Sequence, residues 1–206
     1  MTETARSRLR ATRRAAPQRP AWHPPGITDF AWERRVMAFD ASLANVGWVV
    51  MIIQGGAPVI EGHGTIRPRQ DDDGYMGTWQ RARDLHRQLW GQGLVLRYMY
   101  DDDVLKAVEA PVVGAGHRKE SSLIAGMMVW MESSPIEVIS ATHVSAVLLG
   151  DARIRSGERK PAVKKAVAAL VPEAAGRGWN EHERDSLSIG FTALWDLKQQ
   201  EIAGGV

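Results

Sequence analysis

Three extended segments joined by very short turns constrain the fold of this chain more than any other feature of its sequence. Residues 36–42 (VMAFDAS) form an apolar run interrupted by one acid, and residues 48–53 (WVVMII) are β-branched and aromatic, as in buried strands. A turn containing Asn45 and Gly47 joins them, and a Gln-Gly-Gly turn leads to a third strand at 57–66. Because such short connections join neighbouring antiparallel strands, the three segments predict a meander.

Helical and extended patterns alternate through the rest of the chain. We expect an amphipathic helix at 78–90, a fourth strand at 104–110 and a short fifth strand at 136–140. Further helices are expected at 121–131, 142–150, 161–171 and 180–202. Strand–helix–strand crossovers make parallel neighbours, so the order predicts an α/β fold. Its mixed five-stranded sheet would have three antiparallel strands, then two parallel ones, with helices on both faces.

Residues 1–34 differ in composition from the remainder. Six arginines and a single acid lie within residues 1–28, whereas the rest of the chain has a small excess of acids. We expect a disordered basic arm at 1–34 and one folded domain at 35–206. A partner such as a polyanion would suit this arm, but a passive leader or a targeting peptide would have the same composition.

Several classes of protein are excluded by what the sequence lacks. There is no cysteine, so disulfide scaffolds, thiolate zinc sites and cysteine nucleophiles are ruled out. No P-loop motif is present. No apolar run reaches the roughly 18 residues of a membrane span, so we expect no membrane partner and a cytoplasmic location. Any metal must be held by carboxylates and imidazoles, a donor set that suits Mg²⁺ or Mn²⁺.

Two acids stand where strands normally carry apolar residues. Asp40 interrupts the first apolar run, and burying it is costly unless it is paired or binds a metal. Glu109 ends the fourth strand, at the sheet edge where α/β proteins bind ligands, and Pro111 follows it. A strand-end acid that faces solvent would account for either residue alone.

The last helix begins with a cluster of polar residues, NEHERD. Asn180 and Glu183 fit a capping box, and acids in the first turn also interact favourably with the positive end of the helix dipole. His182 and Asp185 are three residues apart and therefore share one face of the helix. Together with acids from two strand ends, they would suit two-metal phosphodiester cleavage, in which carboxylates converge on two cations about 4 Å apart.

Four segments resemble the RuvC-like Holliday junction resolvases. FDASLANVGW resembles their first-strand motif, AVEAP their fourth-strand glutamate, and EHERDSLSIGFTAL their terminal helix. ATHVSAVLLGDARIRSGERKPAVKKAVAALV is similar to the family's helix, basic loop and lysine-bearing helix. The resemblance covers about residues 36–197 and implies a ribonuclease H-like fold. The composition looks most like that of phage-borne members, which would place the protein in the host cytoplasm.

The resemblance implies a role for each matching residue. Asp40 would bridge two Mg²⁺ ions, for which Mn²⁺ would substitute, Glu109 would hold one, and His182 with Asp185 the other. Lys160 would neutralise charge near the scissile phosphate, although a solvated lysine at a helix start is an equal alternative. Residues expected to contact nucleic acid are His117, Arg118, Lys119, Arg155 and Lys164. The family's bulky residue after the glutamate is replaced here by Val112, Val113 and GAGHRK, which puts its stacking role at the junction centre in doubt.

The function implied is Mg²⁺-dependent endonuclease resolution of four-way and related branched DNA, in recombination and repair. A homodimer is implied, with the apolar helix around Met127–Met131 and Trp130 as one candidate seam. Two alternatives remain open. One is a ribonuclease H-like nuclease for flaps, forks or RNA–DNA hybrids, and the other is a nucleic-acid-binding module without catalysis.

Overall fold

The computed structural model of the protein describes residues 33–41, 44–69, 77–110 and 136–204. The expected helix at 121–131, the proposed dimer seam within it, and the contacts of His117, Arg118 and Lys119 lie outside the described residues. The same holds for residues 1–32, so the boundary between arm and domain stays a prediction.

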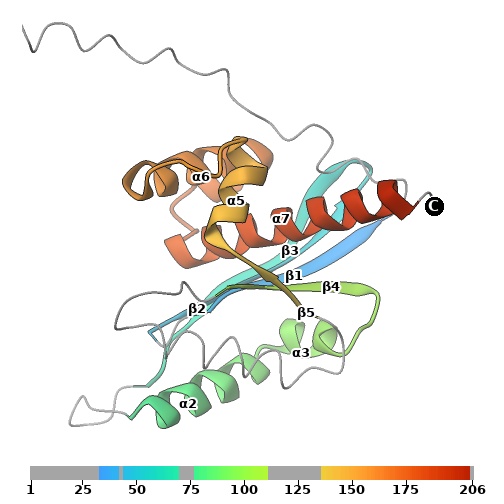
Figure 1. Cartoon of the computed structure of the whole chain (residues 1–206). Coiled ribbons are helices and arrows are strands. Elements are labelled where there is room, and N and C mark those ends of the chain that lie inside the picture. Colours follow the sequence, from blue (N-terminus) through green and yellow to red (C-terminus); the bar gives the residue numbers. More distant parts are fainter. Residues whose placement is uncertain (1–32, 42–43, 70–76, 111–135, 205–206) are drawn as a thin grey trace, which may run out of the picture.

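The described residues form the mixed five-stranded sheet that the sequence predicts (Figure 1). Its strands are β1 (Arg34–Ala41), β2 (Val46–Gln54), β3 (Ala57–Ile66), β4 (Val104–Glu109) and β5 (Ile136–Ile139). The spatial order is β3-β2-β1-β4-β5, in which β1 to β3 are antiparallel, while β4 is parallel to both β1 and β5. Gly55 and Gly56 both have positive φ in the β2–β3 turn, which is what a tight hairpin turn requires.

Helices cover both faces of the sheet (Figure 1). One face carries α2 (Thr78–Trp90) and α3 (Gly93–Met99). The other carries α5 (Ala141–Leu149), α6 (Ser156–Leu170), the 3-10 helix η1 (Pro172–Ala175) and α7 (Glu181–Gly204). Side chains of β1 alternate between two cores: Val36 and Ala38 pack under α7, whereas Met37 and Phe39 pack against α2 and α3. The central strand is therefore apolar on both faces. Within the described ranges, no helix has the length and apolar character needed to cross a membrane.

Two helical segments differ from the sequence-based expectation. The sequence pattern does not predict α3, because seven residues are too few to show helical periodicity. The pattern also predicts a polar loop at 153–160 and a helix that begins at Pro161, but α6 begins at Ser156 and includes that proline. Pro161 lies in the second turn of α6, where its missing N–H removes one helical hydrogen bond, so the helix includes the proline at a cost in stability.

The long helix α7 lies unusually close to the sheet. A side chain added at Gly190 would meet Met51 Cε at 3.1 Å and Ala38 Cβ at 3.3 Å. A Cβ at Gly47 would lie only 2.3 Å from the carbonyl oxygen of His182. These two glycines let α7 pack against β1 and β2, and they fix its first turn over the end of β1.

Candidate functional site

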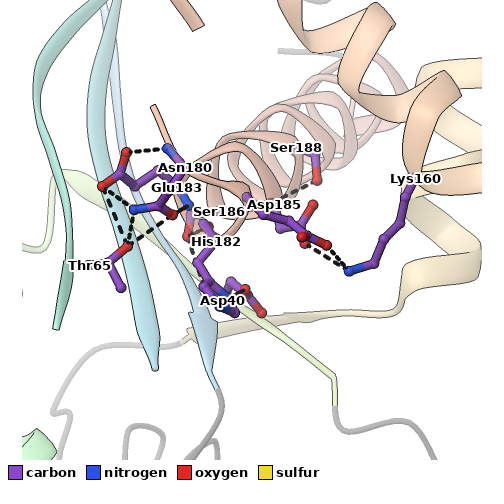
Figure 2. Close-up of polar contacts among 10 residues, drawn as sticks. Asp40, Thr65, Lys160, Asn180, His182, Glu183, Asp185, Ser186 and Ser188 are labelled. Atoms are coloured by element: carbon purple, nitrogen blue, oxygen red, sulfur yellow. Dashed lines mark hydrogen bonds and ion pairs between the residues drawn. The ribbon is translucent and has the colours of Figure 1, made fainter. Parts of the chain in front are cut away.

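Asp40 is the anchor of the site. It is the penultimate residue of β1 and only 7% exposed. Its Oδ2 lies 2.7 Å from Nδ1 of His182, and its backbone N–H donates to Oγ of Ser186 at 3.0 Å. Both contacts reach α7, so the end of β1 is tied to the first turns of this helix (Figure 2).

Glu109 is the last residue of β4 and lies beside Asp40. Phe39 of β1 pairs with Val108 of the parallel strand β4, so the residues that follow each of them emerge side by side. Burial raises the pKa of Glu109 to about 8, and the neighbouring Asp40 charge and a hydrogen bond with Asp40 act in the same direction. In the absence of a bound metal ion, Glu109 is therefore largely protonated at neutral pH, even with the charge of Lys160 nearby.

The first two turns of α7 supply His182 and Asp185, in the helix that the sequence predicts. Burial, followed by the negative charge of Asp40, raises the pKa of Asp185 to about 6. The hydrogen bond to Asp40 raises the pKa of His182. Asp40, Glu109 and Asp185 therefore act on one another electrostatically, and their mutual repulsion is what a bound cation would relieve.

Lys160 approaches this group from α6. Its ammonium forms an ion pair with Glu181 and lies 3.8 Å from Oδ2 of Asp185 (Figure 2). The Lys160 and Glu181 side chains are 68% and 61% exposed, so their ion pair contributes little to stability. The charge of Lys160 acts on both Asp185 and Glu109, and it opposes the rise in their pKa values.

A cleft of about 200 Å³ opens between α5, α6 and α7. Glu109, Lys160 and Asp185 are in its wall, while Asp40 and His182 are not. The other lining residues are Ala141, Val144, Arg159, Val163, Ser188 and Ile189. The carboxylates thus stand at the edge of a space large enough for part of a ligand, between a basic helix and an acidic strand end.

Comparison with known proteins identifies the fold. No protein-family model and no curated protein matches the chain. The structure of Thermus thermophilus RuvC aligns with 80% of this chain and 96% of its own, with a TM-score of 0.61 and 16% identity. The fold of this chain is that of RuvC. T. thermophilus RuvC in complex with Holliday junction substrate aligns over the same shares, with a TM-score of 0.59 and 16% identity. A fowlpox virus resolvase in complex with Holliday junction DNA aligns over 79% of this chain and 98% of its own, with a TM-score of 0.45 and 12% identity.

The RuvC-like fold brings the sequence-predicted site residues together in one region. Asp40 contacts His182, and the charges of Asp40, Asp185 and Lys160 all act on Glu109. Arg155 and Lys164 are exposed near either end of the basic part of α6, outside the cleft wall.

The donors suit a divalent cation by their chemistry. Three carboxylates, two of them with a raised pKa, offer the oxygen ligands that Mg²⁺ prefers. Among the described residues, however, no three His, Asp or Glu side chains already stand in position to hold a metal ion. His182 Nδ1 instead occupies one oxygen of Asp40. Metal binding would therefore require side-chain rotation at this site.

Glu183 has a structural role that its sequence position only partly indicated. The capping box is present: the Asn180 N–H donates to Glu183 Oε2 at 3.0 Å, and the Glu183 N–H donates to Asn180 Oδ1 at 3.2 Å. The buried carboxylate also contacts His63 Nδ1 at 3.2 Å and accepts from Thr65 Oγ1 at 3.4 Å. The His63 ring stacks on Trp179 with centroids 3.9 Å apart. This network joins β3 to the start of α7 on the side away from Asp185 (Figure 2).

Two residues of the site were missed by sequence reasoning. Ser186 follows His182 by one helical turn, and its hydroxyl donates to the His182 carbonyl while accepting from Asp40 N–H. The i, i+4 spacing was the available signal. Arg159 lines the cleft next to Lys160. Its signal was the run of basic residues at the start of α6.

Proposed function

We propose that this protein is a Mg²⁺-dependent endonuclease that resolves four-way and related branched DNA. The observation that carries the proposal is the electrostatic coupling of Asp40, Glu109 and Asp185 beside one cleft, near the ends of two parallel strands and in the first two turns of α7. The RuvC-like fold supports the choice of substrate class, because the solved relative was captured with a Holliday junction.

The residues divide the work of phosphodiester hydrolysis. Asp40, Glu109 and Asp185 would hold the cations, and His182 would join them or tune Asp40. Bound Mg²⁺ would supply activation of the attacking water and stabilisation of the leaving oxygen. Asp40 engages Nδ1 of His182 and so orients the ring, which leaves Nε2 as the nitrogen for a ligand or a proton. Lys160 steadies Asp185 from the opposite wall of the cleft.

A second candidate is a nucleic-acid-binding module that keeps the fold without the chemistry. It is favoured by one observation, the lack of any preassembled group of three His, Asp or Glu ligands in the described part of the chain. It predicts junction binding without turnover in any divalent metal. The buried, mutually repelling carboxylates argue against it, because they cost stability and only a cation or a proton relieves that cost.

The decisive experiment is cleavage of a labelled four-way junction beside linear duplex, a fork and an RNA–DNA hybrid. It is run with Mg²⁺, with chelator, and with Asp40→Asn. We expect symmetric nicks in the junction that need both the metal and Asp40, with a loss of about 10²-fold or more in the variant. Asp103→Asn is the matched control, because this exposed acid precedes β4, at the opposite end from Glu109.

The other outcomes separate the alternatives. Faster cutting of a fork, a flap or a hybrid would keep the site and change the substrate. Binding without cutting in Mg²⁺ or Mn²⁺ would establish the binding module. Full activity in Asp40→Asn would overturn the assignment of the site itself.

The proposal includes a homodimer, since resolution requires cuts in two opposing strands of the junction. Light scattering of the full chain, alone and with junction DNA, measures this directly. Two copies per junction support paired cutting, and one copy per junction contradicts it.

A further inference from the structure

The basic wall of the cleft holds two cations in different electrostatic situations. Arg159 and Lys160 are adjacent on α6, and both line the cleft together with Val163. The ammonium of Lys160 is already paired with Glu181 and lies near Asp185. The guanidinium Nε of Arg159 is shielded from solvent and has no hydrogen-bond partner among the described residues.

An unsatisfied buried N–H on a charged group costs stability. The site carboxylates do not relieve this cost in the described part of the protein. Lys160 is among the main charges that act on Glu109 and Asp185, whereas Arg159 is not. We therefore expect the acceptor for the Arg159 guanidinium to come from outside the described residues.

The chemistry of the cleft selects the kind of acceptor. A guanidinium presents a planar fork of donors that matches phosphate, and it stays charged at every working pH. Arg155 lies one turn before Arg159, so the basic surface continues from the cleft wall to the exposed start of α6. A sugar-phosphate backbone is the polyanion that would follow such a surface.

We propose that Arg159 binds a backbone phosphate of the nucleic-acid strand in the cleft, adjacent to the phosphate that is cut. This rests on the proposed function. Lys160 already has two acidic neighbours, Glu181 and Asp185, whereas Arg159 has a shielded Nε without a hydrogen-bond partner among the described residues. As a contact to a non-reacting phosphate, it governs binding more than the chemical step.

The test is the salt dependence of DNA binding by the full chain in the Asp40→Asn background. Fluorescence anisotropy follows a labelled four-way junction and a linear duplex across a range of salt concentrations. We expect Arg159→Gln to weaken junction binding about tenfold and to reduce the slope of log K against log salt by about 0.9, the value for one phosphate contact. Arg159→Lys keeps the slope but recovers only part of the affinity, because it lacks the fork.

Lys165→Gln is the matched control, because Lys165 is an exposed cation on the same helix and outside the cleft wall. With Asp40 restored, Arg159→Gln is expected to raise KM for the cleaved substrate while kcat changes little. If Arg159→Gln changes the slope of log K against log salt no more than Lys165→Gln does, while the wild-type chain binds the junction, the inference is overturned and the proposed function stands. Failure of the wild-type chain to bind any nucleic acid overturns both. Thermal melting of each variant shows whether it folds.

Discussion

At the residue scale, Glu109 couples the site to the stability of the whole domain. Its pKa is about 8 in the folded protein, above the ordinary value of 4.5 for a glutamate. The folded state therefore binds a proton that the unfolded state has lost between these two pH values, and stability falls as pH rises from about 4.5 to 8. Removing the carboxylate charge should remove the part of this dependence that Glu109 contributes, while Asp185, with a pKa raised to about 6, keeps its own part between about pH 4 and 6.

We expect Glu109→Gln to raise the melting temperature of the metal-free protein at pH 8 and to change it little at pH 4.5. The gain is about 2–4 °C for each kcal/mol recovered. Differential scanning calorimetry across pH measures it, with Glu158→Gln on the exposed first turn of α6 as the control. Mg²⁺ should raise the wild-type melting temperature more than that of Glu109→Gln. Equal Mg²⁺ effects in the two proteins would mean that Glu109 is not a ligand.

The sequence predicted which acids meet but not how they are held. Asp40 and Glu109 were predictable as candidates, because each is an acid in a strand that is otherwise apolar, and Glu109 ends its strand at the sheet edge where ligands bind. His182 and Asp185 were predictable from helical spacing. The contact of Ser186 with Asp40 depends on how α7 is rotated over β1. This rotation cannot be predicted from a local sequence pattern. The unpartnered Nε of Arg159 was hidden for the same reason, since it depends on the packing of α6.

At the element scale, the site depends on how closely α7 approaches β2. Gly47 pairs with Asp40 across the sheet, and a Cβ there would overlap the carbonyl oxygen, carbonyl carbon and Cβ of His182. The obstacle includes backbone atoms, so the helix start must move. We expect Gly47→Ala to destabilise the fold by about 1–3 kcal/mol and to reduce metal-dependent cleavage more than tenfold.

Denaturant unfolding and steady-state cleavage measure these two effects in the same preparation. Gly178→Ala is the matched control, because nothing lies within 4 Å of a Cβ at that position and its φ is not positive. Cleavage by Gly47→Ala at the wild-type rate would show that the first turn of α7 does not need its observed position.

The accuracy of the element predictions followed from how local each signal is. The meander was predictable because its signals, β-branched apolar runs and glycine-containing turns, each lie within a few consecutive residues. The start of α6 was predicted wrongly, because proline favours the first position of a helix whereas α6 continues on both sides of Pro161. The element η1 was also missed, since a four-residue 3-10 helix has no periodicity of its own.

At the scale of the whole molecule, charge is distributed unevenly. The site gathers carboxylates at one end of the sheet, and the basic residues of α6 face them across the cleft. Six of the chain's arginines precede residue 28. A phosphate backbone that is drawn to the basic surfaces would be repelled by the acids until cations neutralise them. Removing the divalent metal should therefore reduce DNA affinity and the cleavage rate by different factors.

This distribution gives the basic arm a testable role in affinity. Deleting residues 1–30 removes six arginines and one glutamate, together with Asp29, from the chain. If the arm binds phosphate, the truncated protein should bind the junction more weakly, and the slope of log K against log salt should flatten by about 0.9 for each phosphate that the arm no longer neutralises. The rate of cleavage at saturating DNA should stay unchanged, because the residues proposed to act in catalysis lie at position 40 and beyond.

A second chain, in which the six arginines are replaced by glutamine, separates the charge of the arm from its length. If charge is what matters, this chain and the truncated one should show the same flattened slope, because counterion release depends on the number of phosphates neutralised and not on the bulk of the arm. Anisotropy titrations at several salt concentrations compare the two with the wild type. An unchanged salt slope in both chains would make the arm a passive leader, and DNA affinity would then depend on the folded domain alone.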